Sequence, residues 1–132
     1  MAASQRMPSP ADVIMLLRNH QWHPVDPATP ASPAIAALWG DPATSPYGAL
    51  LRVPAGFESP LHRHSSDERV IVISGSSVHW VEGEARETAI VLRAGDFMMM
   101  PAGINHVSAA ASNDEDCLEF ITMDGKFDFE LA

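Results

Sequence analysis

The chain has 132 residues, of which 46% are hydrophobic, and its formal net charge at pH 7 is −9. This length and composition are those of one globular domain. Its eight Lys and Arg residues are too few for a nucleic-acid surface, so the sequence predicts no nucleic-acid partner. We also expect no membrane partner, because no apolar run approaches the roughly twenty residues that span a bilayer. A single cysteine, Cys117, and the lack of a signal-peptide pattern favour a cytoplasmic location.

The first predicted unit, residues 1–33, is an N-terminal helix followed by a proline-rich arm. Ser9 is a candidate helix N-cap and Pro10 suits the first helical position. The apolar residues that follow predict a short helix through about Asn19, packed on the outside of the domain or against a partner subunit. Four prolines then fall within residues 24–33, which predicts an extended connector.

Short strands separated by turn signals are predicted throughout the second unit, residues 34–132. Clusters of glycine, proline and aspartate separate them, as in the stretch Gly40-Asp41-Pro42. Many short strands at near-regular spacing predict an all-β sandwich or barrel. The predicted strands are residues 34–38, 47–53, 69–74, 78–82, 87–92, 97–100 and 118–123.

Two patterns of candidate metal ligands lie close together in the middle of the chain. The first has the form G-x5-H-x-H-x3-E-x6-G and contains His62, His64 and Glu68, while the second has the form G-x5-P-x-G-x2-H and ends at His106. His62 and His64 are two residues apart, so on an extended strand both imidazoles leave the same face. Three imidazoles and one carboxylate suit a divalent transition metal and leave positions for water, dioxygen or a chelating substrate. The alternative is a set of surface histidines that bind no metal.

These patterns resemble the two signature motifs of the cupin superfamily. The resemblance implies a jelly-roll β-barrel (a double-stranded β-helix) over residues 34–132, with a metal inside its wide mouth. It makes His62, His64, Glu68 and His106 the expected metal ligands, although some cupins bind through the three histidines alone. The metal it implies is one divalent ion per chain, Fe first, with Zn, Mn or Ni as alternatives.

The segments Leu38-Trp-Gly-Asp41, Pro54-Ala-Gly-Phe57 and Gly125-Lys-Phe-Asp128 resemble a bacterial group related to anti-sigma-factor metal cupins and diketone-cleaving dioxygenases. That resemblance implies an Fe(II)-dependent dioxygenase acting on a small carbonyl or phenolic compound. The alternatives are a non-catalytic zinc cupin that acts as a sensor or binding module, and a metal-dependent isomerase or lyase. Since cupins commonly dimerise, we also expect a homodimer, with the arm of residues 24–33 as a candidate exchanged segment.

A few residues outside the motifs are also candidates for a role in binding or catalysis. His79 has no second histidine at metal spacing, so it is predicted to lie at the surface or behind the ligands. Cys117 has no neighbouring base in the sequence, which favours a buried residue over a nucleophile. Any of Arg52, Arg63 or Arg69 would admit an anionic substrate if it faced the pocket.

Overall fold

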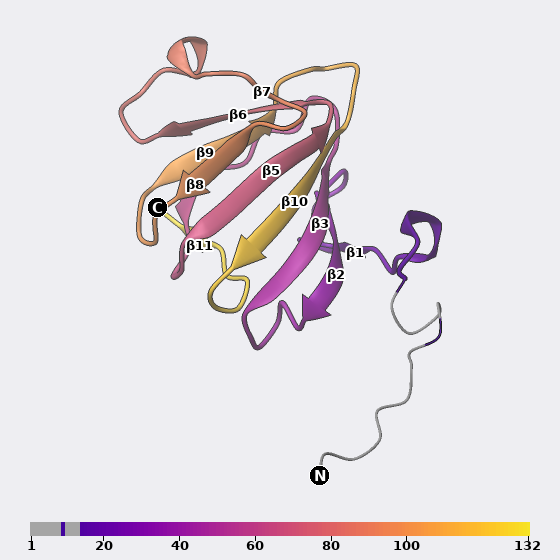
Figure 1. The fold of residues 1–132 in the computed structure, drawn as a ribbon. Helices are drawn as coiled ribbons and strands as arrows, with labels where there is room; N and C mark the ends of the chain where they lie inside the picture. Colours follow the sequence, from indigo (N-terminus) through magenta and orange to yellow (C-terminus); the bar gives the residue numbers. More distant parts are fainter. Residues whose placement is uncertain (1–8, 10–13) are drawn as a thin grey trace.

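Two antiparallel sheets packed face to face make up the fold of the described residues (Figure 1). The computed structural model describes residue 9 and residues 14–132. The six-stranded sheet has the order β1-β2-β3-β10-β5-β8, and the five-stranded sheet has the order β11-β4-β9-β6-β7. Neighbours that are distant in sequence, such as β3 and β10, show that the sheets are built from long-range pairings. The prediction of an all-β fold is confirmed.

The strands are short, as the sequence predicts. The six-stranded sheet contains β1 (His23–Pro24), β2 (Ala34–Gly40), β3 (Tyr47–Val53), β10 (Cys117–Met123), β5 (Glu68–Ser74) and β8 (Phe97–Met100). The five-stranded sheet contains β11 (Glu130–Leu131), β4 (His62–Arg63), β9 (His106–Ala110), β6 (Ser76–Val81) and β7 (Leu92–Arg93). Two single turns of 3-10 helix, η1 (Leu17–Asn19) and η2 (Arg86–Thr88), complete the elements of the described residues.

Strand β10 shows why these segments form a sandwich. Its residues alternate strictly between buried and half-buried positions, as expected when one face of a strand meets the core. Ile121 and Met123 on its inner face pack with Tyr47, Ala49 and Val70 of the two neighbouring strands. The same inner face carries Glu119, an acidic residue at a core position.

One predicted strand, residues 87–92, is wrong over most of its length. The backbone N–H groups of Thr88 and Ala89 donate to the carbonyls of Ala85 and Arg86, so a local turn replaces a ladder with another strand. Ile90 is 80% exposed, and pairing with β6 begins only at Leu92. This segment does contain apolar residues, but it lies at the edge of the five-stranded sheet, where the described chain offers no further strand with which it could pair.

The N-terminal unit differs from its prediction in the part that can be described. Pro10 to Val13 lie outside the described residues, and the remainder of the predicted helix is the single turn η1. The apolar side chains from Ile14 to Leu17 are exposed, so the turn has no packed face to stabilise a longer helix. No helix within residues 9 and 14–132 is long and apolar enough to cross a membrane.

The proline-rich arm lies against its own chain as a series of turns, so the prediction of an extended connector is wrong. The N–H of Thr29 donates to the carbonyl of Asp26, and the N–H of Ser32 donates to the carbonyl of Thr29. Strand β1 pairs with β2, and the N–H of Val25 donates to the carbonyl of Pro33 at 2.8 Å, which closes the arm into a loop. The division of the chain at residue 33 and the exchange of this arm between subunits stay predictions.

Candidate metal centre

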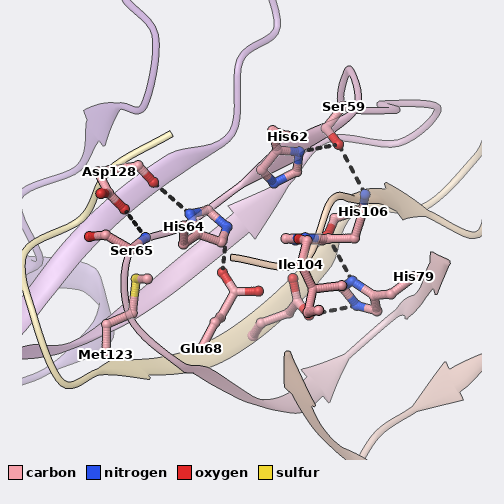
Figure 2. A network of polar contacts seen from close by, with 12 residues as sticks. Ser59, His62, His64, Ser65, Glu68, His79, Ile104, His106, Met123 and Asp128 are labelled. Atoms are coloured by element: carbon pink, nitrogen blue, oxygen red, sulfur yellow. Dashed lines mark hydrogen bonds and ion pairs between the residues drawn. The ribbon is translucent and has the colours of Figure 1, made fainter. Parts of the chain in front are cut away.

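The three motif histidines meet on the inner side of the five-stranded sheet (Figure 2). His62 opens β4 and His106 opens β9, and the antiparallel pairing of these strands places the two residues directly opposite each other. His64 follows immediately after β4. The ring centroids lie 4.3 Å apart for His62 and His106, 4.9 Å for His62 and His64, and 5.3 Å for His64 and His106. All three side chains are buried, so the surface alternative for them is wrong.

Each ring has its Nδ1 atom against a backbone carbonyl oxygen. A carbonyl can only accept a hydrogen bond, so Nδ1 carries the proton in each ring and Nε2 keeps a free lone pair. The ligand atoms of the three rings lie within 4.8 Å of one another. This is the arrangement in which Nε2 atoms bind a metal and Nδ1–H groups hold the rings in orientation. The three Nδ1 bonds run from His62 to Pro60 (2.8 Å), from His64 to Asp128 (2.5 Å) and from His106 to Ile104 (2.9 Å).

The donor set fits a divalent cation. The Nε2 atom of His106 is buried and has no hydrogen-bond partner, which is costly unless another group satisfies its lone pair. Burial lowers the pKa of His62 to about 4, and it also lowers the pKa of His64 and that of His106. The rings are therefore neutral at pH 7, the form that binds a transition metal. A metal ion bound by the three Nε2 atoms would accept the lone pair of His106 Nε2, which has no other partner.

Glu68 lies beside this group and comes from the opposite sheet. It is the first residue of β5, and its Oε2 is 3.4 Å from Nε2 of His64. Burial raises the pKa of this carboxyl to about 7, because few groups near it stabilise a negative charge. A divalent cation at the three histidines would supply that stabilisation. The placement is compatible with a fourth ligand, and coordination by Glu68 stays a prediction.

A cavity of about 530 Å³ adjoins the histidines, large enough for a small organic molecule. His62, His64 and Glu68 line one part of it, and most of the remaining wall is apolar. The proline-rich arm contributes residues between Val25 and Pro33, so this arm narrows the cavity. The apolar wall includes Leu51, Val53, Phe57, Val70, Phe127, Phe129 and Leu131.

The C-terminal segment contributes to the centre in a way that the sequence patterns do not reveal. The ring of Phe129 stacks on that of His62, with centroids 4.2 Å apart and planes inclined by 15°. The carbonyl of Asp128 accepts the bond from His64, while its side chain accepts the N–H of Ser65 at 2.9 Å. No short-range pattern links these residues to the histidines some sixty positions earlier, so sequence reasoning had no signal for them.

Two further ionisable residues also face the cavity. The side chain of His79 is only 7% exposed and lines the cavity, so of its two predicted places, at the surface or behind the ligands, the surface is excluded. Glu119 lines it from the other sheet and is 2% exposed. A signal for Glu119 did exist, since it occupies a core-facing position of the alternating strand β10.

The three arginines that were candidates for an anion site do not line the cavity. Arg52 lies over the ring of Trp22, with its guanidinium carbon 4.2 Å from the ring centroid. Arg63 pairs with Glu130 at 3.1 Å, and Arg69 pairs with Asp124 at 3.1 Å. All three charges are therefore directed to the molecular surface.

Cys117 is fully buried, as predicted, and burial raises the pKa of its thiol to about 12.

The family model described as Domain of unknown function (DUF4437) matches residues 13–130, nearly the whole chain. The chain belongs to this family. A curated relative of this DUF4437 chain, the DNA damage-repair/toleration protein DRT102 of Arabidopsis thaliana, is 29% identical over 119 residues. That match covers 90% of this chain and 35% of the relative, so the chain spans about a third of the length of that protein.

Solved structures similar to this family member include several described as cupins, and this likeness confirms the jelly-roll fold. DMSP lyase DddQ from Ruegeria pomeroyi DSS-3 has a TM-score of 0.67 at 20% identity, over 87% of this chain and 62% of that chain. KdgF from Halomonas sp. has a TM-score of 0.61 at 19% identity, over 83% and 92%. An RmlC-like cupin from Ralstonia eutropha JMP134 has a TM-score of 0.66 at 23% identity, over 85% and 68%.

Proposed function

We propose that this chain is a metal-dependent enzyme that holds one divalent transition metal through His62, His64 and His106, with Glu68 as the fourth ligand. The reaction we propose is dioxygenation by Fe(II) of a small carbonyl or phenolic compound. One observation carries the proposal: three oriented Nε2 lone pairs converge beside a cavity of about 530 Å³, and two of the three histidines, His62 and His64, line it. A site that served only to hold the fold together would be closed on all sides by ligands.

The residues of the chain supply orientation and an apolar environment. Bound iron would supply the redox chemistry and a point of attachment for the oxygen atoms of a chelating substrate. The carbonyls of Pro60, Ile104 and Asp128 keep the three rings in place, and Phe129 covers one face of His62. The apolar wall of the cavity excludes water from the bound substrate, which strengthens electrostatic interactions at the site.

Metal-dependent lyase or isomerase chemistry is the second candidate. One of the similar solved structures is named a DMSP lyase, although at 20% identity that likeness establishes only the fold. The cavity of this chain also contains two buried carboxyl groups, Glu68 and Glu119, and burial raises the pKa of Glu68 to about 7 and that of Glu119 to about 8. Carboxyl groups with pKa values near 7 are suited to give or take protons at neutral pH.

The first test is the metal content per chain of protein purified without a histidine tag. We expect close to one iron per chain in the wild type and loss of that metal in His62→Ala and in His106→Ala. His23→Ala is the matched control, because His23 is exposed in β1 and lies outside the site, so its metal content should be unchanged. No metal in any sample would contradict the proposal.

The reaction is tested next with iron-loaded protein and an oxygen electrode. We expect oxygen uptake with at least one member of a panel of small diketones and catechols, and none with His106→Ala. Tight zinc in place of iron, with no oxygen uptake on any compound, would instead support the lyase candidate or a zinc sensor.

A further inference from the structure

A second polar cluster lies in the same cavity, away from the metal ligands. It consists of His79 and Ser77 on β6, Ser108 on β9 and Glu119 on β10, and it joins the two sheets. In the pairing of β6 with β9, His79 lies opposite Ser108 and Val81 lies opposite His106. His79 and His106 therefore project from the same face of the sheet, separated by two residues, or about 7 Å along the strands.

The cluster is held by hydrogen bonds that fix the ring of His79. Its Nδ1 lies 2.8 Å from Oγ of Ser108, and its Nε2 lies 3.1 Å from Oγ of Ser77. The Oε2 atom of Glu119 lies 3.8 Å from Nε2 of His79, and the Ser77 hydroxyl donates to that same oxygen at 3.5 Å. The contacts to Glu119 are long, so this carboxyl keeps most of its hydrogen-bonding capacity for a partner in the cavity.

The charges around the cavity define which partner suits this carboxyl. Among the residues of the described chain that line the cavity, none is a lysine or an arginine. A buried carboxylate without a cation is costly, so Glu119 favours its neutral form, which both donates and accepts hydrogen bonds. Burial accordingly raises the pKa of Glu119 to about 8 and lowers the pKa of His79 to about 4, so both groups are largely uncharged at pH 7.

We propose that Glu119, with His79 and Ser77 beside it as positioning residues, forms a second recognition site, which binds a neutral hydroxyl or carbonyl group on the part of the substrate that points away from the metal ligands. The inference rests on the proposed function, because the chelated end of the substrate is what directs its other end to this site. The substrate class is thereby narrowed to compounds with chelating oxygens at one end, an apolar body and an uncharged polar group at the other. Anionic substrates are disfavoured, because no lysine or arginine of the described chain lines the cavity to neutralise them.

The test compares two ligands that differ in one hydroxyl group, 4-methylcatechol and 4-(hydroxymethyl)catechol. Their dissociation constants are measured by calorimetry on zinc-loaded protein under argon, so that neither is oxidised. We expect the hydroxymethyl compound to bind about tenfold more tightly to the wild type, the effect of one well-made hydrogen bond. This preference should vanish in Glu119→Leu and in His79→Leu, which serves as a second variant if the first does not fold.

The matched control is Glu115→Leu, which removes one carboxylate from an exposed position outside the cavity and should keep the preference. Equal affinity of the wild type for the two catechols would overturn the recognition site while leaving the proposed function intact. Failure of both catechols to bind zinc-loaded protein would overturn the chelating substrate class, and this inference with it. Tighter binding of 4-(aminomethyl)catechol than of the hydroxymethyl compound would show that the site prefers a cation.

Discussion

At the scale of single residues, the site is built from ionisable groups that burial keeps uncharged. Burial lowers the pKa of His62 and that of His79 to about 4, and it raises the pKa of Glu119 to about 8. His79 and Glu119 lie 3.8 Å apart, but burial keeps both groups in their uncharged forms instead of as an ion pair. The folded state is therefore sensitive to pH at both ends of the neutral range.

Glu119→Gln should make stability less dependent on pH. The folded pKa of Glu119 is raised to about 8 from the ordinary 4.5, so between these values the folded state holds a proton that the unfolded state has lost. The free energy of unfolding of the wild type must then fall as pH rises through this window, by at most about 1.4 kcal/mol per pH unit. Glutamine does not titrate, so the variant gains stability relative to the wild type between pH 5.5 and 7.5. Urea unfolding of metal-free protein measures the difference.

Glu115→Gln is the control for that series, since Glu115 is exposed and its substitution should leave the pH dependence unchanged. Parallel stability curves for wild type and Glu119→Gln would show that the carboxyl of Glu119 is ionised in the folded protein. The role of this group as a neutral donor would then be wrong.

At the scale of elements, the glycines of the two motifs act as turn residues. Gly56, Gly75, Gly95 and Gly103 all have positive φ angles, between 74° and 89°. Residues with a side chain rarely adopt this conformation, and these glycines lie in the connections next to the strands that carry the ligands. The N–H of Gly103, for example, donates to the carbonyl of His64 at 2.9 Å and so connects the two motifs.

Two glycine substitutions separate backbone strain from steric overlap. A Cβ atom at Gly75 would lie 2.2 Å from the carbonyl oxygen of Asp116, whereas one at Gly95 would meet nothing within 4 Å. Gly95→Ala should therefore lower the free energy of unfolding only by the backbone strain of a positive φ angle, about 1–2 kcal/mol. Gly75→Ala should lower the free energy of unfolding by more than about 3 kcal/mol, because the backbone around Asp116 must also move. Urea denaturation measures both, and equal losses would contradict the distinction.

The C-terminal segment is the other element on which the centre depends. Its Asp128 accepts the bond from His64 through the backbone and is itself tied to Ser65 through the side chain. Asp128→Ala should loosen this segment and lower the affinity for metal by about tenfold or more, as expected for residues that orient a ligand. A competition titration with a chromophoric chelator measures the affinity. Asp124→Ala, at an exposed position outside the site, is the control and should leave the affinity unchanged.

At the scale of the whole molecule, apolar side chains gather on the outer face of the six-stranded sheet. Ile71 of β5 and Phe97 of β8 are paired neighbours, and they are 42% and 57% exposed. Met99 and Ile73 on the same strands are also exposed, as is Trp39 on β2. Exposed apolar patches of this kind mark interaction surfaces, and this one supports the prediction of a homodimer.

Light scattering at micromolar concentration should accordingly give twice the mass of the 14.2 kDa chain. Phe97→Arg should shift the protein to the monomer, because it places a charge in the apolar surface. Ile90→Arg is the control, since Ile90 is 80% exposed and lies outside both sheets, before β7. A monomeric wild type would contradict the prediction, and dissociation by Ile90→Arg would place the interface elsewhere.

The all-β fold class and the three histidines of the centre can both be predicted from the amino-acid sequence. The convergence of His62, His64 and His106 is what the resemblance of the two motifs to those of cupins implies, while the fold class follows from the turn residues that divide the strands. The strands at residues 47–53 and 97–100 have the predicted bounds for the same reason. Such patterns act over a few residues, so they can be recognised without any knowledge of the partner strand.

The other residues that share the cavity cannot be predicted in this way, because they are brought together by the packing of the two sheets. Parity along a strand tells which side chains lie on the same face, but not which face is turned inward or which strand lies across the core. His79 and Glu119 are forty residues apart and meet only because β6 and β10 lie in opposing sheets. Phe129 reaches His62 because β11, which follows it, pairs with β4 within the five-stranded sheet. Long-range strand pairing is set by the packing of the whole core, and no local pattern of residues contains it.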